Sequence, residues 1–473
     1  MLMSVSRRDR SVLNEDVLRH IASFLNSDDL ARISHATRVF FDEHLKNVYT
    51  SLSFCKRDKQ TKRFLLHLGY ACFSSCLISD CRPLGSDENS DVALWVRRVG
   101  LQPWLVNPRT KSPRSRTEKL IILLSKVFDP DYTNKVAEKR LQKRLNQDMI
   151  RVTSAFIRMQ NVEEYEIGWF DDKTYHPEFY QAFVSPVLTM WSKQLVKLTL
   201  KIPPAFLNSL AGVHLPKLET FCFTFSTLNL SAVEIDTMHT GFIVFVNNLK
   251  SSLLSLSFMS TNTNENFDLC HIFRFLGTFP LLQGISISLP YDGGQLKDPL
   301  LFVQFLDRHR EELRHLSIFT NRISVRKQEG SPSCIEWIQQ ILLALNTPFP
   351  RLKSLAVALR PLRHKLDAVI KFLDNHTSTL INLKLMDRSL AAHEIAALFG
   401  APYSGQILAH SLSMLHLKVY VFDPYFLTSI ARRLPNLETL YIECNVVKHW
   451  SESFWTTLVS VRTVMYVDNP SHS

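Results

Sequence analysis

A short pattern of apolar positions, apolar-x-x-apolar-x-apolar, recurs along most of the chain. Each copy alternates apolar with small or polar residues, which is typical of a short strand with one buried face. The ten intervals between Val162 and Val461 average about 30 residues, a length at which repeat architectures are built. The copies begin at Val96, Val162, Leu195, Leu218, Leu253, Leu282, Leu313, Leu352, Leu380, Leu412, Leu437 and Val461.

The segments between these strands have the features of helices. Residues 336–345 and 366–373 are amphipathic at helical spacing, and Asp298-Pro299 and Asp423-Pro424 offer an N-cap followed by proline at the first helical position. A proline also precedes four of the strands, as in Leu215-Pro216, where it ends a helix and favours an extended chain. The pattern therefore predicts strand–helix repeats, and the interval from 96 to 162 is long enough for two units or for one expanded unit.

The first fifty residues follow a different pattern, which predicts two short amphipathic helices. Asn14 is a good N-cap for the first helix and Ser27 for the second. Helices this short cannot bury their apolar faces against each other alone, so another surface must cover them. The expected apolar faces are Val17, Leu18, Ile21, Phe24 and Leu25 on the first helix, and Leu30, Ile33, Ala36 and Phe40 on the second.

Charge is unevenly distributed along the 473 residues. The net charge is +11, but residues 1–54 are neutral, residues 55–150 carry +9 and residues 151–473 carry +2. Two basic groups make up much of the excess: Arg109, Lys111, Arg114, Arg116 and Lys119 in an expected loop, and Lys135, Lys139, Arg140, Lys143 and Arg144 on an expected helix. Few aromatic residues interleave with them, so a solvated face is favoured over a nucleic-acid contact.

Little in the sequence points to catalysis, a metal or a membrane. The eight cysteines form no CxxC pair, and His67, Cys72, Cys76 and Cys81 have the spacing of helix faces more than of a metal site. We find no phosphate-binding loop, no GxSxG and no HExxH, and Gly293-Gly294 indicates a turn. We therefore predict a non-enzyme with no cofactor and no metal, not secreted and with no membrane span, in the cytoplasm or nucleus.

The N-terminal residues resemble the F-box. Leu13, Asp16, Val17, Leu18, Ile21, Phe24 and Leu25 fit the first part of its pattern, Asp29-Leu30 the second, and Ala36-Thr37-Arg38-Val39-Phe40 the close, while Asn14 stands where proline is usual. This resemblance implies binding to the Skp-type adaptor, and through it to a cullin, in a ubiquitin ligase. The residues expected to form the motif and its adaptor surface are Leu13, Asn14, Val17, Leu18, Ile21, Leu25, Leu30, Ile33 and Phe40.

The recurring pattern resembles the leucine-rich repeat, and the units at Leu313 and Leu437 extend to its asparagine, at Asn321 and Asn445. The resemblance implies an α/β chain: an F-box at 10–50, a basic helical connecting region at 51–150 that includes the first irregular repeat, and an irregular horseshoe-shaped solenoid at 151–473. The alternative is a doubly wound α/β domain with parallel strands.

In such a solenoid the leucines point into the core, and the residues between them point to the concave face. These intervening residues are the candidate contacts with a target protein. They are Lys197, Lys201, His315, Phe319, Lys384, Met386, His416, Lys418, Tyr441 and Glu443.

Together the two resemblances imply a substrate-recognition subunit of a Skp–cullin–F-box-type ubiquitin ligase. The sequence leaves two alternatives open. One is a leucine-rich-repeat scaffold without a ligase role, in which the N-terminal helices only cap the solenoid. The other, less favoured, is a basic nucleic-acid-binding protein. Neither the target nor a dependence on phosphorylation can be read from the sequence.

Overall fold

The computed structural model divides the chain into two compact units. The first comprises residues 1–168 and 173–195, and the second residues 169–172 and 196–473. The described residues are 14–55, 61, 64–65, 68, 92–102, 132–168, 182–202, 204–226, 230–260, 266–291, 293–321, 336–362, 366–399, 411–422, 424–447 and 462–467. The boundary near residue 195 lies inside the predicted 151–473 repeat domain, and the three-part organisation stays a prediction.

The first unit combines short helices with a parallel sheet. Its strands β1 (Ser51–Phe54), β2 (Arg98–Leu101) and β3 (Glu164–Gly168) pair in chain order. Its helices are α1 (Glu15–Ser23), α2 (Ser27–Ile33), α3 (Arg38–Thr50), the 3-10 helix η1 (Val92–Trp95), α6 (Tyr132–Arg158) and α8 (Ser185–Met190).

The pairing in this unit answers one question that the sequence left open. β2 pairs directly with β3, with Val99 opposite Tyr165, so the long interval from 96 to 162 is one expanded repeat that contains α6. Strand β1 was not predicted. Leu52 and Phe54 of β1, with Tyr49 at the end of α3, follow the same apolar spacing. The spacing was overlooked because it spans the boundary between the predicted F-box at 10–50 and the connecting region at 51–150.

Aromatic residues form the core of the first unit. The ring of Phe156, on α6, lies 5.3 Å from that of Trp191 and 6.4 Å from that of Tyr165, measured between centroids. Both polar tips are satisfied, because the Trp191 indole donates to the Met159 carbonyl at 2.7 Å and the Tyr165 hydroxyl to the Phe183 carbonyl at 2.8 Å. These bonds let large amphipathic rings be fully buried.

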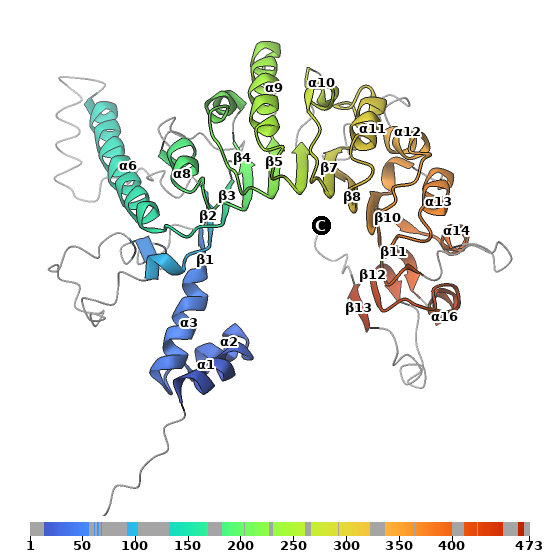
Figure 1. The fold of residues 1–473 in the computed structure, drawn as a ribbon, viewed down its shortest axis with the longest axis horizontal. Helices are drawn as coiled ribbons and strands as arrows, with labels where there is room; N and C mark the ends of the chain where they lie inside the picture. The colour runs from blue at the N-terminus through green and yellow to red at the C-terminus, as the bar shows by residue number, and fades with distance from the viewer. Residues whose placement is uncertain are drawn as a thin grey trace, which may run out of the picture. The chain divides into compact units, whose positions relative to one another are not determined.

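The second unit is a parallel sheet whose strands alternate with helices in a solenoid-like repeat. The helices lie along one side of the sheet (Figure 1), and we call the opposite side the open face. The strands, which pair in chain order, are β4 (Lys197–Lys201), β5 (Thr220–Phe225), β6 (Ser255–Ser260), β7 (Gly284–Pro290), β8 (His315–Asn321), β9 (Ser354–Ala358), β10 (Asn382–Leu390), β11 (Met414–Phe422), β12 (Thr439–Val447) and β13 (Arg462–Val467).

The helical segments between these strands are of modest length. They are η3 (Pro204–Leu210), α9 (Ala232–Asn247), α10 (Leu269–Phe275), α11 (Pro299–Asp307), α12 (Trp337–Ala344), η6 (Arg360–Leu362), α13 (Asp367–Asp374), α14 (Ala392–Leu398) and α16 (Pro424–Arg433). The predicted helices at 336–345 and 366–373 are confirmed as α12 and α13. Asp298 caps α11 as expected, and the cap expected at Asp423 lies outside the described residues.

One backbone arrangement joins successive repeats. The carbonyl of Val196 accepts hydrogen bonds from the amides of Glu219 and Thr220, at 2.9 and 3.0 Å. The carbonyl of Arg314 accepts hydrogen bonds in the same way from the amides of Lys353 and Ser354 in the next repeat. All twelve predicted strands are present, and the apolar positions of the eleven copies from Val96 to Leu437 are buried. The mixed α/β repeat fold is therefore confirmed.

The second N-terminal helix was predicted wrongly in two respects. Asn26, not Ser27, caps α2, because its side chain accepts a hydrogen bond from the Asp29 amide at 2.8 Å. The chain then turns after Ile33, and Phe40 lies on a third helix, α3, for which Thr37 is the N-cap. A residue that caps with its side chain has extended backbone, so Thr37 cannot continue the preceding helix.

Candidate protein-docking surfaces

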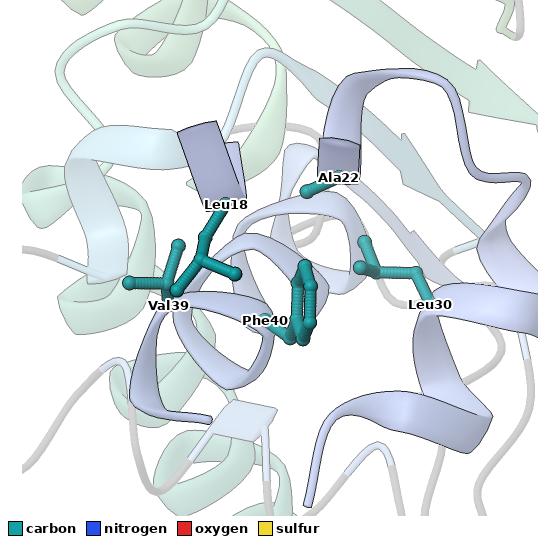
Figure 2. Packing of buried hydrophobic residues seen from close by; sticks show 5 residues of the cluster. All are labelled: Leu18, Ala22, Leu30, Val39 and Phe40. Atoms are coloured by element: carbon teal, nitrogen blue, oxygen red, sulfur yellow. The ribbon is translucent and has the colours of Figure 1, made fainter. Parts of the chain in front are cut away.

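A small apolar cluster holds the three N-terminal helices together. Figure 2 shows Leu18 and Ala22 of α1 with Leu30 of α2 and Val39 and Phe40 of α3, all buried. Leu25 and Ile33 are partly buried and pack against this cluster. The three helices therefore bury part of their apolar surface against one another. The additional surface that the sequence required for the first two helices is supplied in part by α3.

The other side of α1 carries an apolar row that the described structure does not cover. Val17 is 44% exposed, Ile21 40% and Phe24 76%. Their spacing of four and three residues aligns them along one face of the helix. We call these three residues the α1 stripe. Contiguous exposed apolar side chains of this kind usually mark an interaction site.

Polar residues define where α1 begins, and so which of its residues share a face. The Asn14 side chain accepts a hydrogen bond from the Asp16 amide at 3.2 Å, which sets the start of α1. Arg19 lies 3.5 Å from Glu15 and 3.9 Å from Asp16, an exposed arrangement that contributes little to stability. The stripe thus lies on a short helix with a defined start and a packed opposite face.

The predicted adaptor residues fall into four groups. Leu13 lies outside the described residues. Leu18, Leu30 and Phe40 are in the buried cluster, and Leu25 and Ile33 are at its edge. Asn14, Val17 and Ile21 are exposed. The sequence had placed Val17, Leu18 and Ile21 on one face, whereas the structure directs Leu18 inward and its two neighbours outward.

On the open face of the second unit, the strand register aligns the candidate target contacts in rows. Lys384 on β10 pairs with His416 on β11, which pairs with Tyr441 on β12. Lys418 pairs with Glu443 in the next row. All ten predicted target residues are at least partly exposed, with Lys197 and Lys201 on β4, His315 and Phe319 on β8, and the others on β10 to β12.

Three of these residues are engaged with one another. Glu443 accepts from the His416 imidazole at 3.3 Å and from the Lys418 ammonium at 3.5 Å. Partial burial, followed by the nearby Lys384 charge, lowers the pKa of His416, and Glu443 opposes this effect. At β11 and β12 the positive charge is therefore largely compensated within the protein.

At β8 to β10 the positive charge is not compensated. Partial burial lowers the pKa of His315, and the charges of Arg314 and Lys353 lower it further. Lys384 acts on His416 in the same sense. Among the described residues, no carboxylate forms an ion pair with Arg314, Lys353 or Lys384. Arg314, His315 and Lys353 lie close together, and the register places Lys384 level with Ser317, two strands from β8. We call these four residues the basic cluster.

Two of these four residues were not predicted from the sequence. Arg314 and Lys353 each follow the first leucine of a repeat and precede its strand. The predicted contacts came only from the positions between the later leucines and directly after them. The repeat spacing could have revealed the cluster, because equivalent positions of neighbouring units lie side by side in a parallel sheet.

An apolar row crosses the open face two residues beyond Lys384 along the strands. Met259 is 41% exposed on β6, and Phe319 on β8 and Met386 on β10 are partly exposed. Small buried residues separate them: Ser288 pairs with Met259 and Phe319, and Ala358 pairs with Met386. The open face therefore presents large apolar side chains on every second strand.

The structure describes only some of the residues that were considered for nucleic-acid or metal binding. Lys135, Lys139 and Lys143 are exposed on α6, whereas Arg109, Lys111, Arg114, Arg116 and Lys119 lie outside the described residues, as do His67, Cys72, Cys76 and Cys81. No three metal-ligating side chains gather in the part of the chain that the structure describes. None of the described helices has the length and apolar content of a membrane span.

Comparison of the chain with models of known protein families gives no match, and comparison with curated proteins gives none either.

Proposed function

We propose that this chain is the substrate-recognition subunit of a Skp–cullin–F-box-type ubiquitin ligase. The N-terminal helices bind the adaptor in the manner of an F-box, and the leucine-rich-repeat-like unit binds a target protein. The chain contributes no catalysis of its own. It acts by holding the target near the ubiquitin-carrying partner, which raises the effective concentration of one for the other.

The α1 stripe is the observation that carries this proposal. A helix that only capped a solenoid would expose polar residues on its outer face, since exposed apolar area is unfavourable in water. Val17, Ile21 and Phe24 are instead exposed together, on the helix that best fits the F-box pattern. An apolar helix face of this kind suits docking onto a complementary partner surface.

The structure suggests a sharp test of adaptor binding. In the variant Val17→Asp/Ile21→Asp two charges enter the stripe, while the buried cluster of Leu18, Leu30 and Phe40 is untouched. We expect the purified wild-type chain to co-elute with a Skp-type adaptor in gel filtration, and the double variant to elute without it. Burying two charges in an apolar interface costs several kcal/mol, roughly 10²-fold or more in affinity.

A matched control separates this effect from a general loss of solubility or folding. Val233 and Val244 are exposed valines on α9, in the second unit. The variant Val233→Asp/Val244→Asp adds the same charge elsewhere and should keep the adaptor. If the wild-type chain does not bind the adaptor, or if the stripe variant binds it unchanged, the scaffold alternative is favoured.

A further inference from the structure

The open face of the second unit carries a positive charge that no carboxylate of the described residues pairs with. Three cations contribute to it: Arg314 and Lys353, before strands β8 and β9, and Lys384 on β10. The His315 imidazole, at the start of β8, lies close to the first two. Partial burial lowers the pKa of His315, and the charges of Arg314 and Lys353 lower it further, since a proton there would meet two like charges. Like charges held together without a counterion favour an anionic ligand.

The carboxylates of Asp387 and Glu443, on the neighbouring strands, do not neutralise the positive charge of the basic cluster. Asp387 accepts a hydrogen bond from the Thr320 hydroxyl, and Glu443 is engaged by His416 and Lys418. Neither forms an ion pair with the basic cluster. The uncompensated charge is therefore confined to β8, β9 and β10, at the middle of the open face.

The chemistry beside the cluster distinguishes between classes of anion. Met259, Phe319 and Met386 lie in one row, two residues beyond Lys384 along the strands, with Ser288 and Ala358 between them. Large apolar side chains that stay partly exposed are typical anchors for protein segments. Nucleic acid would require more cations and stacking aromatic rings, and a single phosphate would leave the apolar row unused.

From these observations we propose that the open face binds an acidic linear segment of a target protein, with its carboxylates on the basic cluster and its apolar side chains on the row of Met259, Phe319 and Met386. The inference rests on the proposed role as a target receptor and names the chemical class of the target segment.

The spacing of the row indicates the form of the segment. Strands in a sheet are about 4.8 Å apart, so side chains on every second strand are about 9.6 Å apart. A polyproline-type extended chain advances about 3.1 Å per residue, or about 9.3 Å in three residues. A segment that crosses the strands with an apolar residue at every third position would place one of these side chains beside each of Met259, Phe319 and Met386.

The test uses a fluorescent synthetic peptide with leucine at every third position and glutamate between. We expect the full chain to bind it, with affinity falling as salt screens the charges. The variant Lys353→Glu/Lys384→Glu should weaken binding at least about tenfold, and Phe319→Ser should also weaken it. A peptide of the same composition in scrambled order should bind less tightly.

Matched controls lie away from the open face. Lys250, in the turn after α9, and Lys371, on α13, are exposed, so Lys250→Glu/Lys371→Glu makes the same charge change. Phe275→Ser removes a phenylalanine that is 53% exposed on α10. Both control variants should bind the peptide as the wild type does.

Three outcomes would overturn the inference: no binding of the peptide, equal weakening by the control variants, or tighter binding of a single-stranded RNA with which the peptide does not compete. Adaptor co-elution is measured on the same preparations. If the wild-type chain binds the adaptor but not the peptide, this inference fails and the ligase role stands. If it binds the peptide but not the adaptor, the ligase role fails and the peptide site stands.

Discussion

At the residue scale, two buried histidines join successive repeats. The Nε2 atom of His309 accepts a hydrogen bond from the Phe279 amide at 2.9 Å, while its Nδ1 atom bonds the Phe305 carbonyl at 2.7 Å. His376 does the same with Phe349, at 3.0 Å, and with Phe372, at 2.7 Å. Each imidazole thus satisfies a backbone amide of the preceding Phe-Pro turn, which would otherwise be buried without a partner.

These bonds require neutral imidazoles, which predicts a dependence on pH. Burial lowers the pKa of His309 and of His376 below the ordinary value of 6.5. As the pH falls below that value, the unfolded chain takes up protons that the folded chain refuses, so stability is full above about pH 6.5 and is lost below it. Amide hydrogen exchange, corrected for its intrinsic rate, should show Phe279 and Phe349 losing protection between about pH 7.5 and 5.5.

The variant His309→Gln/His376→Gln provides the control. Glutamine offers an oxygen acceptor that does not titrate, so protection of the two amides should be lower at neutral pH but should change less with acidification. The Leu254 amide, which donates to the Glu219 carbonyl at 2.8 Å, reports on a joint between repeats in which no histidine accepts a backbone hydrogen bond among the described residues. A wild-type protein whose Phe279 and Phe349 amides stay equally protected at both pH values would contradict this account.

At the scale of elements, α1 has two apolar rows with different roles. Leu18 and Ala22 hold the helix to α2 and α3, and Val17, Ile21 and Phe24 remain exposed. A periodic pattern in the sequence merges both rows into one wide apolar face. Only the position of α3, which contacts one side of α1, separates them.

We expect the N-terminal cluster to depend on Leu30, which is completely buried. Leu30→Ala should destabilise the three helices by about 3 kcal/mol, because it removes apolar contacts and leaves a cavity. Hydrogen exchange of the α1 and α3 amides should then be faster. Leu300→Ala, at a position that is 52% exposed on α11, should cost much less. Equal effects of the two changes would argue against a packed N-terminal cluster.

The sequence predicted some elements better than others, for physical reasons. Strands such as β8 were predictable because Leu316 and Ile318 must alternate with exposed residues to fill one core. The break before α3 was missed because α2 ends at Ile33 and Thr37 begins α3 through a side-chain hydrogen bond, which apolar spacing does not record. Arg314 and Lys353 of the basic cluster were missed because they precede their strands, outside the positions between the later leucines.

At the scale of the whole molecule, the two compact units have separate proposed tasks. The first carries the α1 stripe, and the second carries the basic cluster and the apolar row of the open face. Since no residue is shared between these surfaces, each should be removable without loss of the other. The proposed ligase role needs both, because proximity arises only when one chain binds two partners.

The most direct test of this role is affinity capture of the full chain from cells, followed by mass spectrometry of the bound proteins. We predict that the wild type and Val233→Asp/Val244→Asp capture a Skp-type adaptor and a cullin. Val17→Asp/Ile21→Asp should lose both and retain the other bound proteins, which include the target. Absence of adaptor and cullin from the wild-type capture, or their undiminished presence with the α1 stripe variant, would contradict the account.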